Sequence, residues 1–294
     1  MSGAWPAPAK LNLFLHVTGR RPDGYHELQT LFQLIDLEDE IDVQVRHDGQ
    51  FTVTGGAPGV APEQDLVVRA ARLLRERAGG ASLGADFRLT KRIPVGGGLG
   101  GGSSDAATVL VALNELWGIG WGADRLAGLG LELGADVPVF VHGNNALGRG
   151  VGERLEPLAL PRRAFAVIFP GTPVATASAF QAPELTRNSP EITISGCLLP
   201  IAYDAALPGR NDLEPVVAAR HPPVRAALDW LSARGSPARL TGSGACVFAV
   251  HADRAAAQAA LAGMPAGWTG FAVEGLERSP LLARVLAERS GARR

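Results

Sequence analysis

A glycine-rich stretch carries the strongest chemical signal in this chain of 294 residues. Six glycines flank one leucine, two serines follow, and an alanine-rich helical pattern begins directly afterwards. Glycine lets a ligand approach the backbone N–H groups closely, and the start of a helix adds partial positive charge. The stretch therefore predicts a phosphate-binding loop, which consists of Pro94, Val95, Gly96, Gly97, Gly98, Leu99, Gly100, Gly101, Gly102, Ser103 and Ser104.

Two common phosphate-binding motifs explain this loop poorly. A Walker A loop ends in Gly-Lys-Ser/Thr, whereas Gly102 is followed by Ser103 with no lysine between them. The spacing of Gly96, Gly98 and Gly101 matches the dinucleotide-binding fingerprint, but the loop does not lie in an opening βαβ unit. The acidic residue expected about 20 positions later, at the end of a second strand, is also missing. A glycine-rich loop without a ligand is a third alternative, although ordering so many glycines costs entropy.

Lysine is rare in this chain. Lysine and arginine together number 28, yet only Lys10 and Lys91 are lysines. One interpretation is that both survive a compositional bias by chance. The other is that these two positions need a compact ammonium on a flexible stem, which a wide guanidinium cannot replace. Their positions favour the second interpretation, because Lys10 opens an alternating strand and Lys91 lies just before the glycine-rich loop.

Asp136 is the candidate general base. A carboxylate that takes the proton from an alcohol contributes about 10²–10⁴-fold to a rate. Asp136 also precedes Val137 and Pro138, and aspartate in that position is common at the N-cap of a helix. The residues alone leave both interpretations open.

The hydropathy pattern predicts which elements position these residues. It predicts strands at 10–17, 41–45, 85–93, 164–169, 238–241, 245–250 and 270–273, and helices at 66–77, 104–117, 124–133, 224–234 and 253–262. Lys10 and Asn12 share one strand face. Lys91 falls in the apolar register of its strand, so it needs a partner or a cleft. From residue 164 the order is β-α-β-β-α-β, which predicts a ferredoxin-like unit with an insertion.

Composition restricts the classes of function. The net charge of −1 gives no basic surface for nucleic acid or membrane binding. No apolar run is as long as a membrane span, and the N-terminus lacks the pattern of a signal peptide. The two cysteines, Cys197 and Cys246, favour reduced thiols and a cytoplasmic location.

The glycine-rich loop resembles the Pro-x-Gly-x-Gly-Leu-Gly-Ser-Ser loop of the galactokinase, homoserine kinase, mevalonate kinase and phosphomevalonate kinase superfamily. Within the superfamily, the chain resembles the family of 4-diphosphocytidyl-2-C-methyl-D-erythritol kinases. The matching blocks are residues 8–30, 94–140, 211–215 and 239–248. The first block is specific to this family rather than to its relatives.

The resemblance implies an α+β kinase with two domains. Residues 1–155 would form an N-terminal α/β ATP-binding domain of the ribosomal S5 domain 2-like kind, and residues 156–294 a C-terminal ferredoxin-like domain. The active site would lie between them and would use ATP and Mg²⁺. It would phosphorylate the 2-hydroxyl of 4-diphosphocytidyl-2-C-methyl-D-erythritol, in the non-mevalonate route to isoprenoid precursors. No obligate protein partner is implied, and residues from about 185 to 208 receive no role.

On the ATP side, the resemblance assigns roles to Lys10, Asp136, Lys91 and Asp65. Lys10 pairs with Asp136 and keeps it ionised. Lys91 lies near the adenine, as does Asp65, where the family usually has an asparagine that can also donate a hydrogen bond. Ser104 is a possible ligand of phosphate or Mg²⁺, or alternatively a helix N-cap.

On the substrate side, the resemblance implies contacts with the polyol and the base. Asn12 and Thr176 would bind the polyol. Tyr25 and Phe180 would stack on the cytosine while His26 binds its polar edge. Phe180 could instead be an ordinary core residue.

Two other functions are considered. The substrates of homoserine and mevalonate kinases have no base on which an aromatic ring could stack. Tyr25 and His26 therefore argue against these two activities. A nucleotide-binding protein without catalysis has no need of Lys10 and Asp136 together with the loop.

Overall fold

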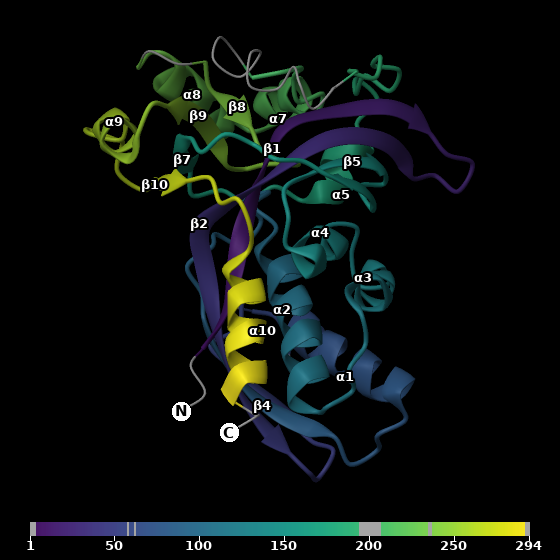
Figure 1. Ribbon diagram of the computed structural model, residues 1–294. Coiled ribbons are helices and arrows are strands. Elements are labelled where there is room, and N and C mark those ends of the chain that lie inside the picture. Colours follow the sequence, from purple (N-terminus) through teal and green to yellow (C-terminus); the bar gives the residue numbers. More distant parts are fainter. Residues whose placement is uncertain (1–3, 58, 62, 194–206, 235–236, 292–294) are drawn as a thin grey trace.

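A computed structural model describes residues 4–57, 59–61, 63–193, 207–234 and 237–291. Figure 1 shows two sheets, one above the other, each covered by helices. The strands are β1 (Trp5–Arg20), β2 (His26–Arg46), β3 (Phe51–Thr54), β4 (Gly84–Thr90), β5 (Ala146–Gly150), β6 (Arg154–Pro157), β7 (Ala164–Phe169), β8 (Arg239–Leu240), β9 (Val247–His251) and β10 (Thr269–Glu274). The helices are α1 (Leu66–Ala78), α2 (Gly101–Leu116), α3 (Ala123–Leu131), α4 (Val137–His142), α5 (Thr176–Phe180), α7 (Glu214–Arg220), α8 (Pro222–Ser232), α9 (Arg254–Ala260) and α10 (Pro280–Gly291).

The first sheet has the order β3-β4-β2-β5-β6, and β1 pairs with β2 in addition. Only β3 and β4 are parallel. Helix α2 packs on β1 and β2 and contacts α1 and α4. Its apolar side chains, such as Leu110 and Leu113, join Trp5 and Phe87 in the core beneath the sheet. The rigid sheet and core thus hold the N-terminus of α2, which follows the glycine-rich loop.

The second sheet has the order β10-β7-β9-β8 and is antiparallel throughout. Helices α8 and α9 pack against it. The order along the chain is β-α-β-β-α-β, so the predicted ferredoxin-like arrangement is confirmed. The predicted α+β class is confirmed with it.

The long hairpin of β1 and β2 connects the two sheets. In Figure 1 this purple hairpin rises from the first sheet beside the second and then bends over β5 and α5. Leu11, Leu13 and Phe14 of β1 share a core with Phe165 of β7 and Phe248 of β9. The same strand therefore contributes to the cores of both units, which fixes their relative position.

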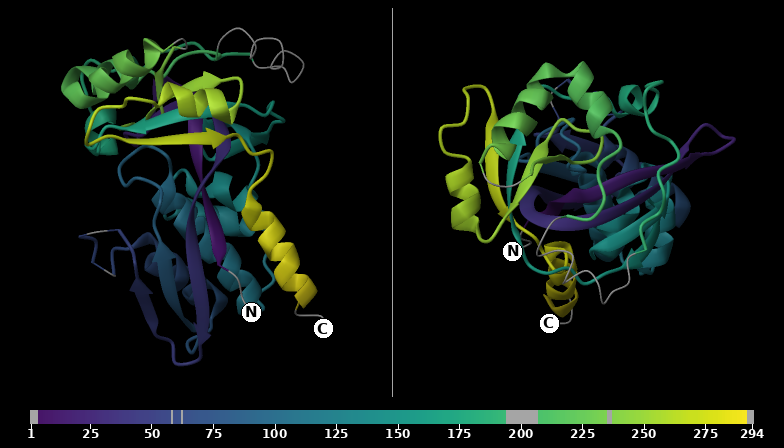
Figure 2. Two further views of the ribbon diagram at one scale, coloured as in Figure 1. Left: turned by 90° about the vertical axis from the view of Figure 1, so that its left-hand side faces the viewer. Right: turned by 90° about the horizontal axis from the view of Figure 1, so that it is seen from above.

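The C-terminal helix returns to the first unit. Helix α10 contacts β1 and α2, and its Leu281 and Val285 belong to the first core. Figure 2 shows this yellow helix extending away from the second sheet. The sequence predicts no helix here, and the predicted boundary at 155/156 stays a prediction.

Several boundaries differ from those that the sequence predicts. Strand β1 begins at Trp5, and a register shift between Asn12 and Leu15 interrupts its alternation. Strand β4 ends at Thr90 instead of continuing to residue 93, because Asp39 accepts hydrogen bonds from the backbone N–H groups of the two residues after Lys91. Among the described residues, no helix combines the length and the apolar character needed to cross a bilayer.

Candidate active site

A cavity of about 930 Å³ lies where the two units meet. The glycine-rich loop, the hairpin of β1 and β2, the start of α4 and helix α5 all contribute to its lining. Every residue predicted for the site lines this cavity except Ser104. Residues that are distant in the sequence are therefore brought together as one candidate active site.

The glycine-rich loop is held tightly between the two units. Gly96, Gly98 and Gly100 have positive φ angles of 69°, 75° and 76°. The carbonyl oxygens of Gly96 and Gly97 accept hydrogen bonds of 3.0 and 2.9 Å from the backbone N–H groups of residues 245 and 246. Helix α2 begins at Gly101 with no side-chain cap, so its first N–H groups are available to an anion. This geometry is that of a phosphate cradle.

Gly98 can be tested by adding a single methyl group. A Cβ at Gly98 would lie 2.3 Å from the carbonyl oxygen of Thr241, in addition to the strain of a positive φ. We expect Gly98→Ala to lower the free energy of unfolding by about 3 kcal/mol, measured by urea denaturation. Gly79 is the matched control, because its φ is 73° and a Cβ there would meet nothing within 4 Å. Gly79→Ala should cost only about 1 kcal/mol, and equal losses in the two variants would contradict a packed loop.

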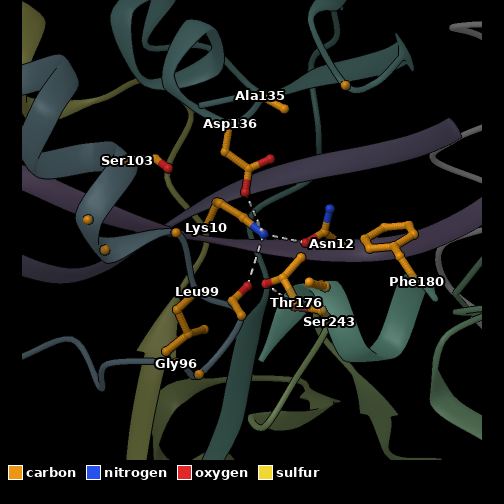
Figure 3. A pocket seen from close by; sticks show the side chains of 18 of the residues that line it. Lys10, Asn12, Gly96, Leu99, Ser103, Ala135, Asp136, Thr176, Phe180 and Ser243 are labelled. Carbon is orange, nitrogen blue, oxygen red and sulfur yellow. Dashed lines mark hydrogen bonds and ion pairs between the residues drawn. The ribbon is translucent and has the colours of Figure 1, made fainter. Parts of the chain in front are cut away.

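Lys10 lies at the centre of the cavity wall. Its side chain projects from β1 and is 2% exposed. The ammonium donates a hydrogen bond of 2.9 Å to the carbonyl oxygen of Gly98 and another to Oδ1 of Asn12. It also forms an ion pair with Asp136, with 3.3 Å between Nζ and Oδ2. Figure 3 shows Asp136 and Asn12 on different sides of the Lys10 ammonium. One buried positive charge therefore joins the glycine-rich loop to the candidate base.

Asp136 occupies the N-cap position of α4, but its side chain makes no capping hydrogen bond. Its carboxylate is 33% exposed and faces Lys10 at the cavity. Of the two interpretations that the sequence leaves open, the contacts of the side chain favour the base. An ionised carboxylate beside a fixed cation and open to a ligand can accept the proton of a hydroxyl group.

Asn12 and Thr176 lie beside this pair. The Asn12 amide donates a hydrogen bond of 2.8 Å to Thr30, while its oxygen accepts from Lys10. The Thr176 hydroxyl lies 2.8 Å from that of Ser243, from the loop between β8 and β9. Asn12 thus orients Lys10. The sequence predicts only a contact between Asn12 and the polyol, so this role is additional.

Lys91 has the partners that its apolar register predicts. Its ammonium lies between the carboxylates of Asp39 and Asp105. Burial raises the pKa of Asp105 to about 7; the nearby positive charge of Lys91 opposes this rise, and the negative charge of Asp39 adds to it. Asp105 lies in α2, one turn after its first residue, so this cluster ties the helix to β2 and to the end of β4. The sequence interpretation missed both carboxylates, because neither belongs to a recognisable motif.

Asp65 is the N-cap of α1. Its Oδ1 accepts a hydrogen bond of 2.9 Å from the backbone N–H of Val67. Aspartate and asparagine cap helices about equally well, so the departure from the family's usual asparagine preserves this local role. The side chain also lines the cavity.

Ser104 does not fit its predicted role. It is fully buried inside α2, and its hydroxyl donates a hydrogen bond of 2.7 Å to the carbonyl oxygen of Pro8. It is not the N-cap either, because α2 begins three residues earlier, at Gly101. The neighbouring Ser103 lines the cavity instead.

Aromatic side chains form the far end of the cavity. The rings of His26 and Phe180 lie 5.3 Å apart, tilted by 30°. Tyr25 is 65% exposed in the turn of the hairpin and also lines the cavity. Arg187, which the sequence interpretation missed, donates a hydrogen bond of 3.1 Å to His26. A flat ring could be held here.

Cys246 lies behind the glycine-rich loop and does not line the cavity. Cys246 is a free, fully buried thiol whose pKa is raised by burial. Its backbone supports the glycine-rich loop. Cys197 lies outside the described residues, as does most of the segment without a predicted role.

The chain is similar to known proteins over nearly its whole length. Residues 65–144 match the family model of the GHMP kinases N terminal domain, and residues 196–270 match that of the GHMP kinases C terminal. The chain is 56% identical over 290 residues to a 4-diphosphocytidyl-2-C-methyl-D-erythritol kinase of Alkalilimnicola ehrlichii, covering 99% of this chain and 97% of that protein. It is 53% identical to the kinase of that name from Halorhodospira halophila, with 98% of each chain covered. A crystal structure of 4-(cytidine 5'-diphospho)-2C-methyl-D-erythritol kinase superposes with a TM-score of 0.80 at 37% identity, covering 92% of this chain and 98% of that one.

Proposed function

The chain belongs to the 4-diphosphocytidyl-2-C-methyl-D-erythritol kinases of the GHMP kinase family, and we propose that its cavity transfers the γ-phosphate of ATP to the 2-hydroxyl of 4-diphosphocytidyl-2-C-methyl-D-erythritol. One observation carries the assignment of the residues. The Lys10–Asp136 ion pair lies between a phosphate cradle and an aromatic pocket within one cavity. A hydroxyl group and a γ-phosphate could meet there.

The reaction needs alignment and charge stabilisation more than covalent chemistry. Asp136 accepts the proton of the substrate hydroxyl group. As it does so, the hydroxyl oxygen forms a bond to the γ-phosphorus, and the bond between that phosphorus and the oxygen of ADP breaks. Lys10 holds the Asp136 carboxylate through their ion pair and stabilises the negative charge on the transferred group. The N–H groups of the glycine-rich loop and of the first turn of α2 hold the phosphates.

Mg²⁺ fits the oxygen donors at the phosphate cradle. Among the described residues, no group of His, Cys, Asp and Glu side chains could hold a cation alone. Mg²⁺ commonly keeps several waters and binds substrate phosphates together with one or two protein oxygens. The Ser103 hydroxyl, which lines the cavity beside the cradle, would be one such oxygen, and the ion would neutralise phosphate charge there.

The two nucleotides of the proposed reaction would occupy opposite ends of the cavity. The adenosine of ATP would lie near Asp65 and Lys91, at the start of α1 and the end of β4. The cytidine of the substrate would lie among Tyr25, His26 and Phe180. Both ends are lined by described residues of the same cavity, which supports this arrangement.

Release of ADP with different alcohols tests the proposed function. With Mg-ATP present, we expect turnover of 4-diphosphocytidyl-2-C-methyl-D-erythritol, and kcat/KM values at least about 10³-fold lower for homoserine and mevalonate. Those alcohols leave the aromatic end of the cavity empty. Preferred turnover of either one would favour another kinase of the superfamily. Binding of ATP without turnover of any alcohol would favour a protein that only binds nucleotides.

A further inference from the structure

The Arg187 guanidinium connects two elements at the aromatic end of the cavity. One of its terminal nitrogens donates to the carbonyl oxygens of Phe180 and Ala182, at 3.2 and 2.6 Å, and the other donates to Leu185 at 3.0 Å. The Nε–H donates to Nε2 of His26 at 3.1 Å. The carbonyl contacts fix the guanidinium at the C-terminal end of α5. The Nε–H is therefore held in place opposite the imidazole.

This hydrogen bond determines where His26 carries its proton. An arginine is always protonated and can only donate, so Nε2 of His26 must accept. Burial and the positive charges of Arg187 and Arg20 lower the pKa of His26, which keeps the ring neutral. A neutral imidazole that accepts at Nε2 carries its hydrogen on Nδ1. Nδ1 has no hydrogen-bond partner among the residues that the structure describes.

We infer that Arg187 makes the cavity selective for cytosine over uracil by holding the His26 proton on Nδ1. Cytosine presents an acceptor at N3 beside its amino group, whereas uracil presents an N–H at the same position. An Nδ1–H donor can form a hydrogen bond with N3 of cytosine, whereas in uracil it would face another N–H donor. Contact of the His26 ring with Phe180, whose carbonyl Arg187 also binds, fixes the plane in which the donor points. Arg187 is thus a positioning residue, and this inference rests on the proposed function.

Arg187→Met tests the inference, because it keeps an apolar stem and removes every donor. We expect the KM for the cytidine substrate to rise about tenfold with little change in kcat, because one hydrogen bond to the base is lost. The preference in kcat/KM over the uridine analogue of the substrate should fall about tenfold. Arg220→Met is the matched control. Arg220 binds the same segment, through the Ser178 carbonyl and Glu184, and makes no contact with His26.

Nitrogen-15 NMR of the histidine side chains supplies a second readout that needs no variant of Arg187. In the wild-type protein without substrate, we expect His26 to be neutral with its proton on Nδ1, and a His26→Gln variant assigns its signals. A proton on Nε2, or a charged ring at pH 7.5, would overturn the inference even if Arg187→Met fails to fold.

The kinetic outcomes separate the two proposals. Turnover by the wild type with unchanged base preference in Arg187→Met would contradict the inference alone. An equal loss of preference in Arg220→Met would also overturn it, because loosening of the segment would then account for the effect. Absence of turnover by the wild type would instead contradict the proposed function.

Discussion

Asp136→Asn should lower kcat by about 10³-fold while the affinity for ATP stays within about twofold of the wild type. The amide has nearly the same shape as the carboxylate but cannot take a proton from a hydroxyl group. Stability should fall by only about 1 kcal/mol, because the side chain makes no capping hydrogen bond and the asparagine oxygen can still accept a hydrogen bond from Lys10. Single-turnover kinetics measure the chemical step, and equilibrium titration with ATP measures the affinity.

Asp253→Asn is the matched control for this variant. Asp253 is also the N-cap of a helix, α9, where it accepts a hydrogen bond of 2.8 Å from Ala256. Asparagine caps as well as aspartate, so both kcat and stability should remain at wild-type values. Full activity in Asp136→Asn would sink the assignment of the base and leave Lys10 and the loop with a binding role only.

The sequence predicts those parts of the site whose residue types are uncommon outside their chemistry. Six glycines around one leucine at the start of a helix are costly to order unless a ligand binds their backbone. Two lysines among 28 cationic residues are also few enough to suggest that these positions need lysine. The apolar register of Lys91 predicts a buried partner without saying which one. Asp39 and Asp105 supply it only because α2 and β2 pack side by side, which no local pattern encodes.

The parts that the sequence does not predict depend on tertiary geometry. The sequence motif does not distinguish Ser103 from Ser104. Which of the two serines faces the cavity depends on the residue at which α2 begins. That residue is Gly101, because positive φ at Gly100 precedes the first helical turn. Arg187 carries no motif, since its partners are main-chain carbonyls and a histidine 161 positions away. The sequence does not predict helix α10, because this helix packs on the core of the first unit, whose residues lie far away in the sequence.

Lys10→Arg should be nearly as damaging as Lys10→Met, with both variants lowering kcat/KM by about 10³-fold. Arginine keeps the charge, so this expectation rests on geometry. The ammonium satisfies Asn12, Gly98 and Asp136, which lie in different directions around it. A planar guanidinium is longer and places its donors in one plane.

The glycine-rich loop packs closely against the Lys10 side chain. The side chain is 2% exposed, and a Cβ on Gly100 would lie only 3.1 Å from its Cε. The guanidinium would therefore displace the backbone of the glycine-rich loop, and the affinity for ATP should fall in Lys10→Arg but much less in Lys10→Met. Measuring kcat/KM and ATP affinity for both variants separates the loss of charge from the loss of space. If Lys10→Arg kept a third or more of the wild-type kcat/KM, the lysine would be a survivor of the arginine bias rather than a requirement of the site.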